Sequence, residues 1–286
     1  MFHKVPLFAA LILLVGFGSH RSATAASCVW KVTSAEGHVL YLGGSFHALR
    51  PTDYPLPQQY NAAFDASSRL VFEEDPKTGA AAFTALLKAG EYPKGDSLKN
   101  HVDPRTYGYL RRFFAIRNVP EHKFARLHAW LLDLILTLPP PQYYQLGVES
   151  FLEKRAAANA KPVSGLESTR EHNGVFAGLS DRQAEALLLV EFINAARENS
   201  GGANLFEAWR RGNVDVLAAK LRETYQDFPY MAERLLDDRN RRWIPKIEQL
   251  LRSGQTCFVV VGAGHLGGSQ GVLALLNARG YKAEQL

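Results

Sequence analysis

The amino-acid sequence predicts an α/β fold with a mixed central sheet and a large helical insertion. Two apolar segments each run into a Gly-x-x-His pattern, "YLGGSFH" near the start of the chain and "FVVVGAGH" near its end. The first of them is followed by a helical pattern and another strand pattern at the spacing of a βαβ unit. The region from about residue 79 to 255 is mostly helical in pattern. A chain of 286 residues, 47% hydrophobic, can bury a substantial core.

The first 26 residues have the pattern of a signal peptide. Lys4 precedes an apolar run, Val5 to Phe17, which has the length of a signal h-region and is short for a membrane span. An Ala-Thr-Ala triplet follows and fits a small-x-small cleavage site. We therefore expect a signal peptide at residues 1–26, cleaved near Ala25 or Ala26.

Two alternatives stay open for this segment, an uncleaved membrane anchor and lipidation at Cys28. No second apolar stretch is long enough to span a bilayer, so we expect an exported mature chain, residues 27–286, that is soluble and periplasmic or secreted. Cys28 opens the first strand and Cys257 opens the last, and an oxidising compartment permits one disulfide between them.

The net charge of +5 is spread along the chain. It lacks the clustered Lys/Arg stripe of a nucleic-acid-binding protein, so we expect no nucleic-acid partner. The substrate, a peptide or another small molecule, and the oligomeric state are left open by the sequence.

A β-hairpin is expected at the start of the domain, with strands at Cys28–Ser34 and His38–Gly43. A Pro-rich loop follows, and then a helix in "LPQQYNAAFDAS", where Pro57 is tolerated in the first turn. "RLVFEEDP" is the next strand and ends at acids and a proline. The spacing of these elements predicts that the strands ending at Gly44 and Phe72 are parallel.

The middle of the chain is expected to be a series of helices with one short strand, "KPVSGLES". Ser180 and Gln183 form a capping box at the start of one of these helices. A Val-rich buried strand, "TCFVVVGAGH", returns to the sheet, and "GVLALLNARG" is the closing helix. Periodic patterns predict the other helices in "AAFTALLKAG", "DPRTYGYLRRFFAIRN", "FARLHAWLLDLILTL", "GVESFLEKRAAANA", "SDRQAEALLLVEFINAARE", "NLFEAWRRGNVDVLAAKLRETY" and "MAERLLDDRNRRWIPKIEQLLRSG".

Both Gly-x-x-His patterns lie just past the carboxyl end of a strand, where ligands bind in open α/β sheets. If the two strands are close neighbours, His47 and His265 converge at one sheet edge, where Glu73 and Glu74 end another strand. The two glutamates are adjacent and point to opposite faces, so only one of them can face this site. Two imidazoles and a carboxylate can hold a catalytic divalent metal, and without metal they can act as general base and orienting group. Each pattern alone is more often only a turn, and the pairing is what favours a site.

The stretch "YLGGSFHALRPTDYPLPQQYNAAFDASSRLVFEEDP" resembles the N-terminal signature of the TraB/GumN family, to which the Tiki metalloproteases also belong. "GLES", "DDRNRRW" and "VGAGHLGG...LLNARGY" resemble later blocks of that family, in the same order, so that the resemblance covers about residues 29 to 286. One departure is "GGSFH" where the family more often has "GTxH", although Ser45 keeps a hydroxyl. The site that the resemblance implies consists of His47, Glu73, Arg239, Asn240 and His265, with turns shaped by Gly44, Ser45, Gly262 and Gly264.

The resemblance implies a metal-dependent hydrolase that is peptidase-like, by analogy with the Tiki members. His47, His265 and Glu73 would hold the divalent cation. Arg239 would be a clamp for an oxyanion or a substrate carboxylate, whereas its basic helix alone would be read as a solvated charged face.

Two residues outside this set are further candidates. Glu167 ends the "GLES" strand and would either join the site or make a structural hydrogen bond, and His172 lies nearby in "REHN". Two alternative functions stay open. One is a non-catalytic metal- or haem-binding protein, and the other is a metal-independent, esterase-like hydrolase in which His47 or His265 is the base.

Overall fold

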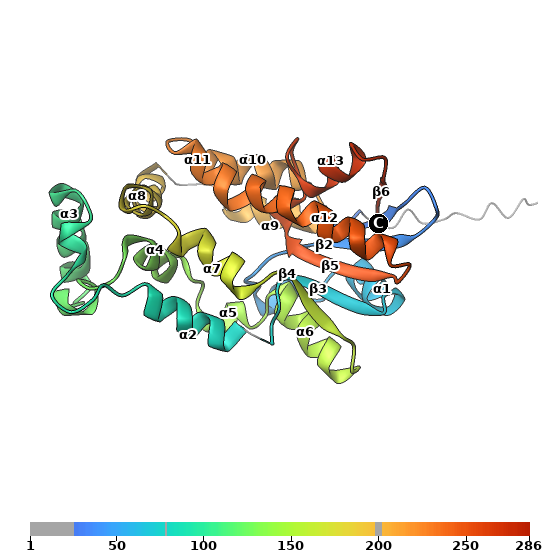
Figure 1. Ribbon diagram of the computed structural model, residues 1–286, viewed down its shortest axis with the longest axis horizontal. Helices are drawn as coiled ribbons and strands as arrows, with labels where there is room; N and C mark the ends of the chain where they lie inside the picture. Colours follow the sequence, from blue (N-terminus) through green and yellow to red (C-terminus); the bar gives the residue numbers. More distant parts are fainter. Residues whose placement is uncertain (1–25, 78, 198–201) are drawn as a thin grey trace, which may run out of the picture.

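The computed structural model of the protein describes residues 26–77, 79–197 and 202–286 and confirms the predicted fold class. In this part of the chain the centre is a six-stranded mixed sheet in the order β4–β3–β5–β2–β1–β6 (Figure 1). The strands are β1 (Val29–Thr33), β2 (Val39–Ser45), β3 (Arg69–Glu74), β4 (Val163–Glu167), β5 (Cys257–Gly262) and β6 (Lys282–Gln285).

The four strands β4, β3, β5 and β2 are parallel, so their carboxyl ends meet at one edge of the sheet. β5 lies between β2 and β3, and its last residue, Gly262, pairs with Ser45 at the end of β2. The prediction that the strands ending at Gly44, Phe72 and Gly262 share an edge is therefore confirmed. The Val run of β5 is fully buried, as expected for an inner parallel strand that is covered on both faces.

Helices cover both faces of the sheet (Figure 1). α1 (Gln58–Ala66) and α6 (Val148–Ala158) bury Phe64 and Leu152 against the strands, and α12 (Asp238–Arg252) buries Trp243. α12 contacts both β4 and β2 and also packs on α13 (Val272–Asn277). One continuous core therefore joins the sheet to helices from three distant parts of the sequence.

The predicted helical insertion is present and has a second hydrophobic core of its own, which includes Leu110, Trp130, Leu188 and Met231. Several of its helices extend away from the sheet on the left of Figure 1. The helices in this part of the chain are α2 (Gly79–Ala89), α3 (Pro104–Ile116), α4 (Ala129–Thr137), α5 (Pro141–Tyr144), α7 (Thr169–Ala177), α8 (Asp181–Arg197), α9 (Gly202–Arg210), α10 (Val214–Thr224) and α11 (Pro229–Ala232). Of these, α9 and α10 pack on the core of the sheet, through Trp209 and Leu217. Short helical turns lie at η1 (Pro51–Asp53), η2 (Leu98–Asn100), η3 (Glu121–Lys123), η4 (Glu233–Asp237, a π-helical turn) and η5 (Ala263–His265).

Three elements differ from the prediction. The helix expected from residue 124 begins only at Ala129, because residues 125 and 126 accept backbone hydrogen bonds from Leu98 and Tyr92. The helix expected through residues 204–225 is divided at Gly212, whose φ of +66° favours glycine. β6 was not predicted, because its sequence "KAEQ" is polar and it pairs at the sheet edge with β1 alone.

The disulfide that the sequence left open is not formed, since Cys28 and Cys257 are both free and buried. β1 runs antiparallel to β2 and β5 runs parallel to it. Val29 therefore pairs near the carboxyl end of β2, at Gly43, whereas Cys257 pairs near its start, at Leu40. Cys28 precedes β1 and Cys257 begins β5, but because the two strands run in opposite directions the cysteines lie near opposite ends of β2.

Two expectations concern the N-terminal segment and the membrane. The signal peptide predicted at residues 1–26 falls almost wholly outside the described residues. Among the helices that the structure describes, none combines the length and the apolar character needed to cross a bilayer.

His101 ties the start of α8 to the loop that precedes α3. Its ring nitrogens lie 2.8 Å from Asp181 Oδ2 and 2.8 Å from Asp96 Oδ2. The ring of Tyr92 stacks between His101, at 4.1 Å, and His128, at 3.7 Å. Hydrogen bonds to Asp181 and then Asp96 raise the pKa of His101, whereas burial lowers the pKa of His128.

We expect His101→Gln to destabilise the protein mainly at acidic pH. Because the pKa of His101 is raised in the folded state, its contribution is full below the unfolded pKa and is lost as the pH rises through the folded pKa. Urea unfolding at pH 5.5 should show a loss of about 1–2 kcal/mol, and a smaller loss at pH 9. His122→Gln, an exposed change in η3, is the control and should alter neither value. Equal losses at both pH values would contradict the assignment of His101 as a charged link.

Candidate active site

Four strands deliver side chains to the carboxyl edge of the sheet. Glu73 is the last but one residue of β3, and Glu167 ends β4, the neighbouring strand in the sheet. Ser45 and Gly262 end β2 and β5 and pair with each other. The residues after β2 and β5 carry His47 and His265 into the same region.

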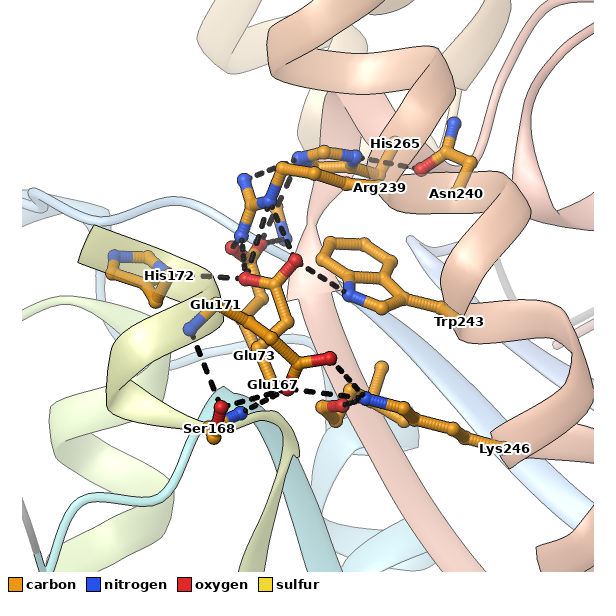
Figure 2. Close-up of polar contacts among 12 residues, drawn as sticks. Glu73, Glu167, Ser168, Glu171, His172, Arg239, Asn240, Trp243, Lys246 and His265 are labelled. Atoms are coloured by element: carbon orange, nitrogen blue, oxygen red, sulfur yellow. Dashed lines mark hydrogen bonds and ion pairs between the residues drawn. The ribbon is translucent and has the colours of Figure 1, made fainter. Parts of the chain in front are cut away.

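Arg239, in the first turn of α12, is the centre of this edge (Figure 2). Its Nη2 lies 2.6 Å from Glu73 Oε2 and 2.9 Å from Glu167 Oε2, and its Nε lies 3.0 Å from Glu167 Oε1. Only 8% of Arg239 is exposed, so its basic helix does not present it to solvent. Burial opposes its charge, but Glu73 and Glu167 outweigh this effect and raise the pKa of Arg239. The sequence alternative of a solvated charged face is therefore wrong for this residue.

The two carboxylates stay ionised because of the same contacts. Burial favours neutral Glu73, but the charge of Arg239, followed by that of His265, holds the pKa of Glu73 far below its usual range. Glu73 Oε1 also accepts a hydrogen bond of 2.6 Å from the backbone N–H of Gly262. Of the two adjacent glutamates, Glu73 is the one that contacts Arg239, as the resemblance implied.

Glu167 has all of its oxygens engaged by donors. Besides Arg239, it accepts from Trp243 Nε1 at 3.0 Å, and its Oε2 lies 3.2 Å from His172 Nδ1. It is almost completely buried. Glu167, expected as a possible member of the site, thus lies behind Arg239 and fixes that side chain, and His172 contacts the cluster only through Glu167.

His265 is buried in η5 and held at both ring nitrogens. Asn240 Nδ2 donates to the carbonyl of Gln270, which turns Asn240 Oδ1 toward His265 Nδ1 at 2.7 Å. His265 Nδ1 therefore donates, and its Nε2, 3.3 Å from Arg239 Nη1, accepts. Burial lowers the pKa of His265 to about 3, so that the ring is neutral.

His47 has a very different environment, because 59% of its side chain is exposed. Its Nδ1 lies 2.8 Å from Glu149 Oε1, and the hydroxyl of Ser45 donates to the same oxygen. The charge of Glu149 is the main cause that raises the pKa of His47. Glu149 belongs to the first turn of α6, whose start is fixed by a 3.1 Å bond from Val148 N to Phe46 O.

Glu149 is the functional candidate that sequence reasoning missed. Glu149 is an acid in the first turn of a helix, which is a common place for an acid, and it lies 102 positions after His47 along the chain. Nothing in the sequence therefore links the two residues. The only local signal is Gly147, whose added Cβ would meet the carbonyl group of His47, so that α6 can approach this loop closely.

The two Gly-x-x-His elements meet around Gly262. A Cβ at Gly262 would lie 3.3 Å from Glu73 Oε1, 3.4 Å from His265 Cδ2 and 3.7 Å from His47 Nε2. These three groups therefore surround one small space that a side chain at Gly262 would fill. The other glycines act elsewhere, since a Cβ at Gly44 would crowd Cys28 and one at Gly264 would crowd Leu221.

The predicted metal ligands are engaged by other groups. Arg239 donates to Glu73 Oε2 and to His265 Nε2, and Gly262 donates to Glu73 Oε1. Of the three ligands, only His47 has no contact with Arg239, and each oxygen of Glu73 already accepts one hydrogen bond. A guanidinium at hydrogen-bond distance from two of the three ligands would also repel a dication. Within the described residues no group of three or more His, Cys, Asp or Glu side chains is placed to hold a metal ion, so this donor set does not fit a resident cation.

Residues 28–285 match the TraB/PrgY/gumN family. No curated protein and no solved structure matches the chain.

We expect Glu167→Gln to lower the free energy of unfolding by about 3 kcal/mol or more, because it leaves buried Arg239 with one carboxylate. Urea denaturation measures the change. Glu171→Gln is a matched control on the neighbouring helix, where an exposed carboxylate lies 3.2 Å from Lys246 and caps α7. It should cost about 1 kcal/mol or less. Similar losses for the two variants would show that the buried ion pair does not hold this edge.

Proposed function

The chain belongs to the TraB/PrgY/gumN family, and we propose that it is a hydrolase in which His47 activates a water molecule for attack on a carbonyl group. The observation that carries the proposal is the pair of His47 and Glu149. The carboxylate fixes the tautomer with the proton on Nδ1, and this leaves the Nε2 lone pair facing the space beside Gly262. The same division of labour between a histidine and its orienting carboxylate is used by many hydrolases.

A water molecule in that space has two acceptors on the protein. Glu73 Oε1 orients one of its protons and His47 Nε2 removes the other, so that hydroxide forms as it attacks the carbonyl carbon. The His47 imidazolium then returns the proton to the leaving group. Glu149 raises the pKa of His47, which makes it a stronger base and leaves a smaller unprotonated fraction at neutral pH.

Arg239, Asn240 and His265 have supporting roles in this proposal. The positive charge of Arg239 is shared by two carboxylates, so we assign it the positioning of Glu73 in place of the expected oxyanion clamp. Asn240 orients His265, and the neutral ring of His265 lines one side of the space beside Gly262. Peptides and esters both present a suitable carbonyl group, and the family resemblance favours peptides.

We expect His47→Ala to lower kcat by about 100-fold or more on a substrate found by screening fluorogenic peptides and esters. Glu149→Gln should lower kcat by about 10-fold or more with little change in KM, because it removes the group that orients the base. His47→Ala should keep the melting temperature, since His47 is mostly exposed. His122→Ala is the control for loss of an exposed histidine. A fully active His47→Ala would sink the proposal.

A chelator separates this mechanism from the metal-dependent one. We expect activity of the wild-type protein to survive dialysis against EDTA, because Arg239 contacts both His265 Nε2 and Glu73, and its positive charge opposes the binding of a dication there. Loss of activity that returns with one divalent metal would replace the proposal by the metal-dependent hydrolase expected from the family resemblance.

A further inference from the structure

A groove of about 360 Å³ lies between α7 and the turn that leads into α12, outside the candidate active site. Three arginines line it. Arg170 comes from α7, Arg234 from η4 and Arg242 from α12. Among the residues that the structure describes, none of the three has an acidic partner, and Arg170 and Arg242 make no hydrogen bond.

Two acids, Glu171 and Asp238, also line the groove, and both are paired with cations other than its three arginines. Glu171 lies 3.2 Å from Lys246 and accepts from the backbone N–H of Ser168, and Asp238 lies 2.5 Å from Arg241. The three arginines outnumber the two acids in the lining, and both acids already have a cationic partner, so the groove has an excess of positive charge.

Arg234 is held in place within this groove. Its Nε donates to the carbonyl of Val175 at 2.8 Å, and its Nη2 donates to that of Gly174 at 3.0 Å. Both carbonyls belong to the last turns of α7, a helix end that favours a cation. Its Nη1 remains for a ligand, while the exposed Arg170 and Arg242 can approach from the two helices on either side.

We propose that this groove binds a tetrahedral oxyanion, the phosphate group of a phosphorylated ligand. Guanidinium groups that line one groove and are not paired with its acids repel one another, and a bound anion removes that cost. A planar carboxylate is satisfied by one bidentate arginine, whereas three guanidinium groups from different elements suit an anion with several oxygens in three dimensions. The groove is independent of the proposed hydrolase chemistry, because it contains none of the side chains assigned to that chemistry.

Calorimetric titration of the full chain with inorganic phosphate, at constant pH and ionic strength, tests the site. We expect saturable binding that weakens about 10-fold or more in the double variant Arg170→Gln/Arg242→Gln. Arg252→Gln removes an exposed positive charge from the last turn of the same α12 and should change the affinity less than twofold. Thermal melting of each variant without phosphate checks that the fold is kept.

Two results would overturn the proposal. Equal weakening by Arg252→Gln and by the double variant, or no saturation by phosphate, would mean that only the general charge of the surface attracts anions. Succinate that binds the wild-type protein as tightly as phosphate would assign the groove to carboxylates. Sulfate is expected to compete with phosphate, because it has the same tetrahedral shape.

Discussion

The buried ion pair of Arg239 with Glu73 and Glu167 is the interaction on which the candidate site depends. It joins α12 to the ends of β3 and β4, which lie 166 and 72 positions away from Arg239 in the sequence. Such a pair adds little net stability, because desolvation offsets much of the attraction, but losing one partner leaves an uncompensated charge. The ion pair therefore acts mainly on the specificity of the fold. It selects the arrangement of α12 over the sheet in which Arg239, Glu73 and Glu167 are all paired.

The two halves of the site have similar sequences and opposite chemistry. His265 is buried, neutral and hydrogen-bonded at both ring nitrogens, to Asn240 and to Arg239. His47 is largely exposed, and Glu149 raises its pKa. Environments that move the pKa values of two like groups in opposite directions are typical of sites where the groups have different roles. One histidine thus belongs to the wall of the site and the other remains free to exchange a proton.

The helical insertion has its own hydrophobic core and reaches the site through α7. Glu149 of α6 and Glu167 of β4 belong to the sheet and the helices packed on it, and His172 of α7 contacts Glu167. Movement of α7 relative to the sheet would therefore disturb Glu167, a partner of Arg239. The groove between α7 and α12 lies at this same junction.

Much of the fold follows from local patterns. The Val run of β5, the two strand-end Gly-x-x-His elements and the periodic helices between them are read over a few residues each, and all appear in the structure. The convergence of the two histidine-bearing loops could also be anticipated, because parallel strands share one edge. Where a local pattern was weak, as in the polar strand β6, the element was missed.

The sequence by itself determined the class of fold, the edge of the sheet where chemistry is expected and most of the polar side chains there. Tertiary structure decided how those side chains pair. The antiparallel direction of β1 separated Cys28 from Cys257, and the approach of α6 supplied Glu149 to His47. Burial of Arg239 between two carboxylates engaged two of the three predicted metal ligands, Glu73 and His265. The physical reason is that each of these outcomes depends on contacts between segments far apart in the chain, and no periodicity or spacing within one segment specifies its distant partner.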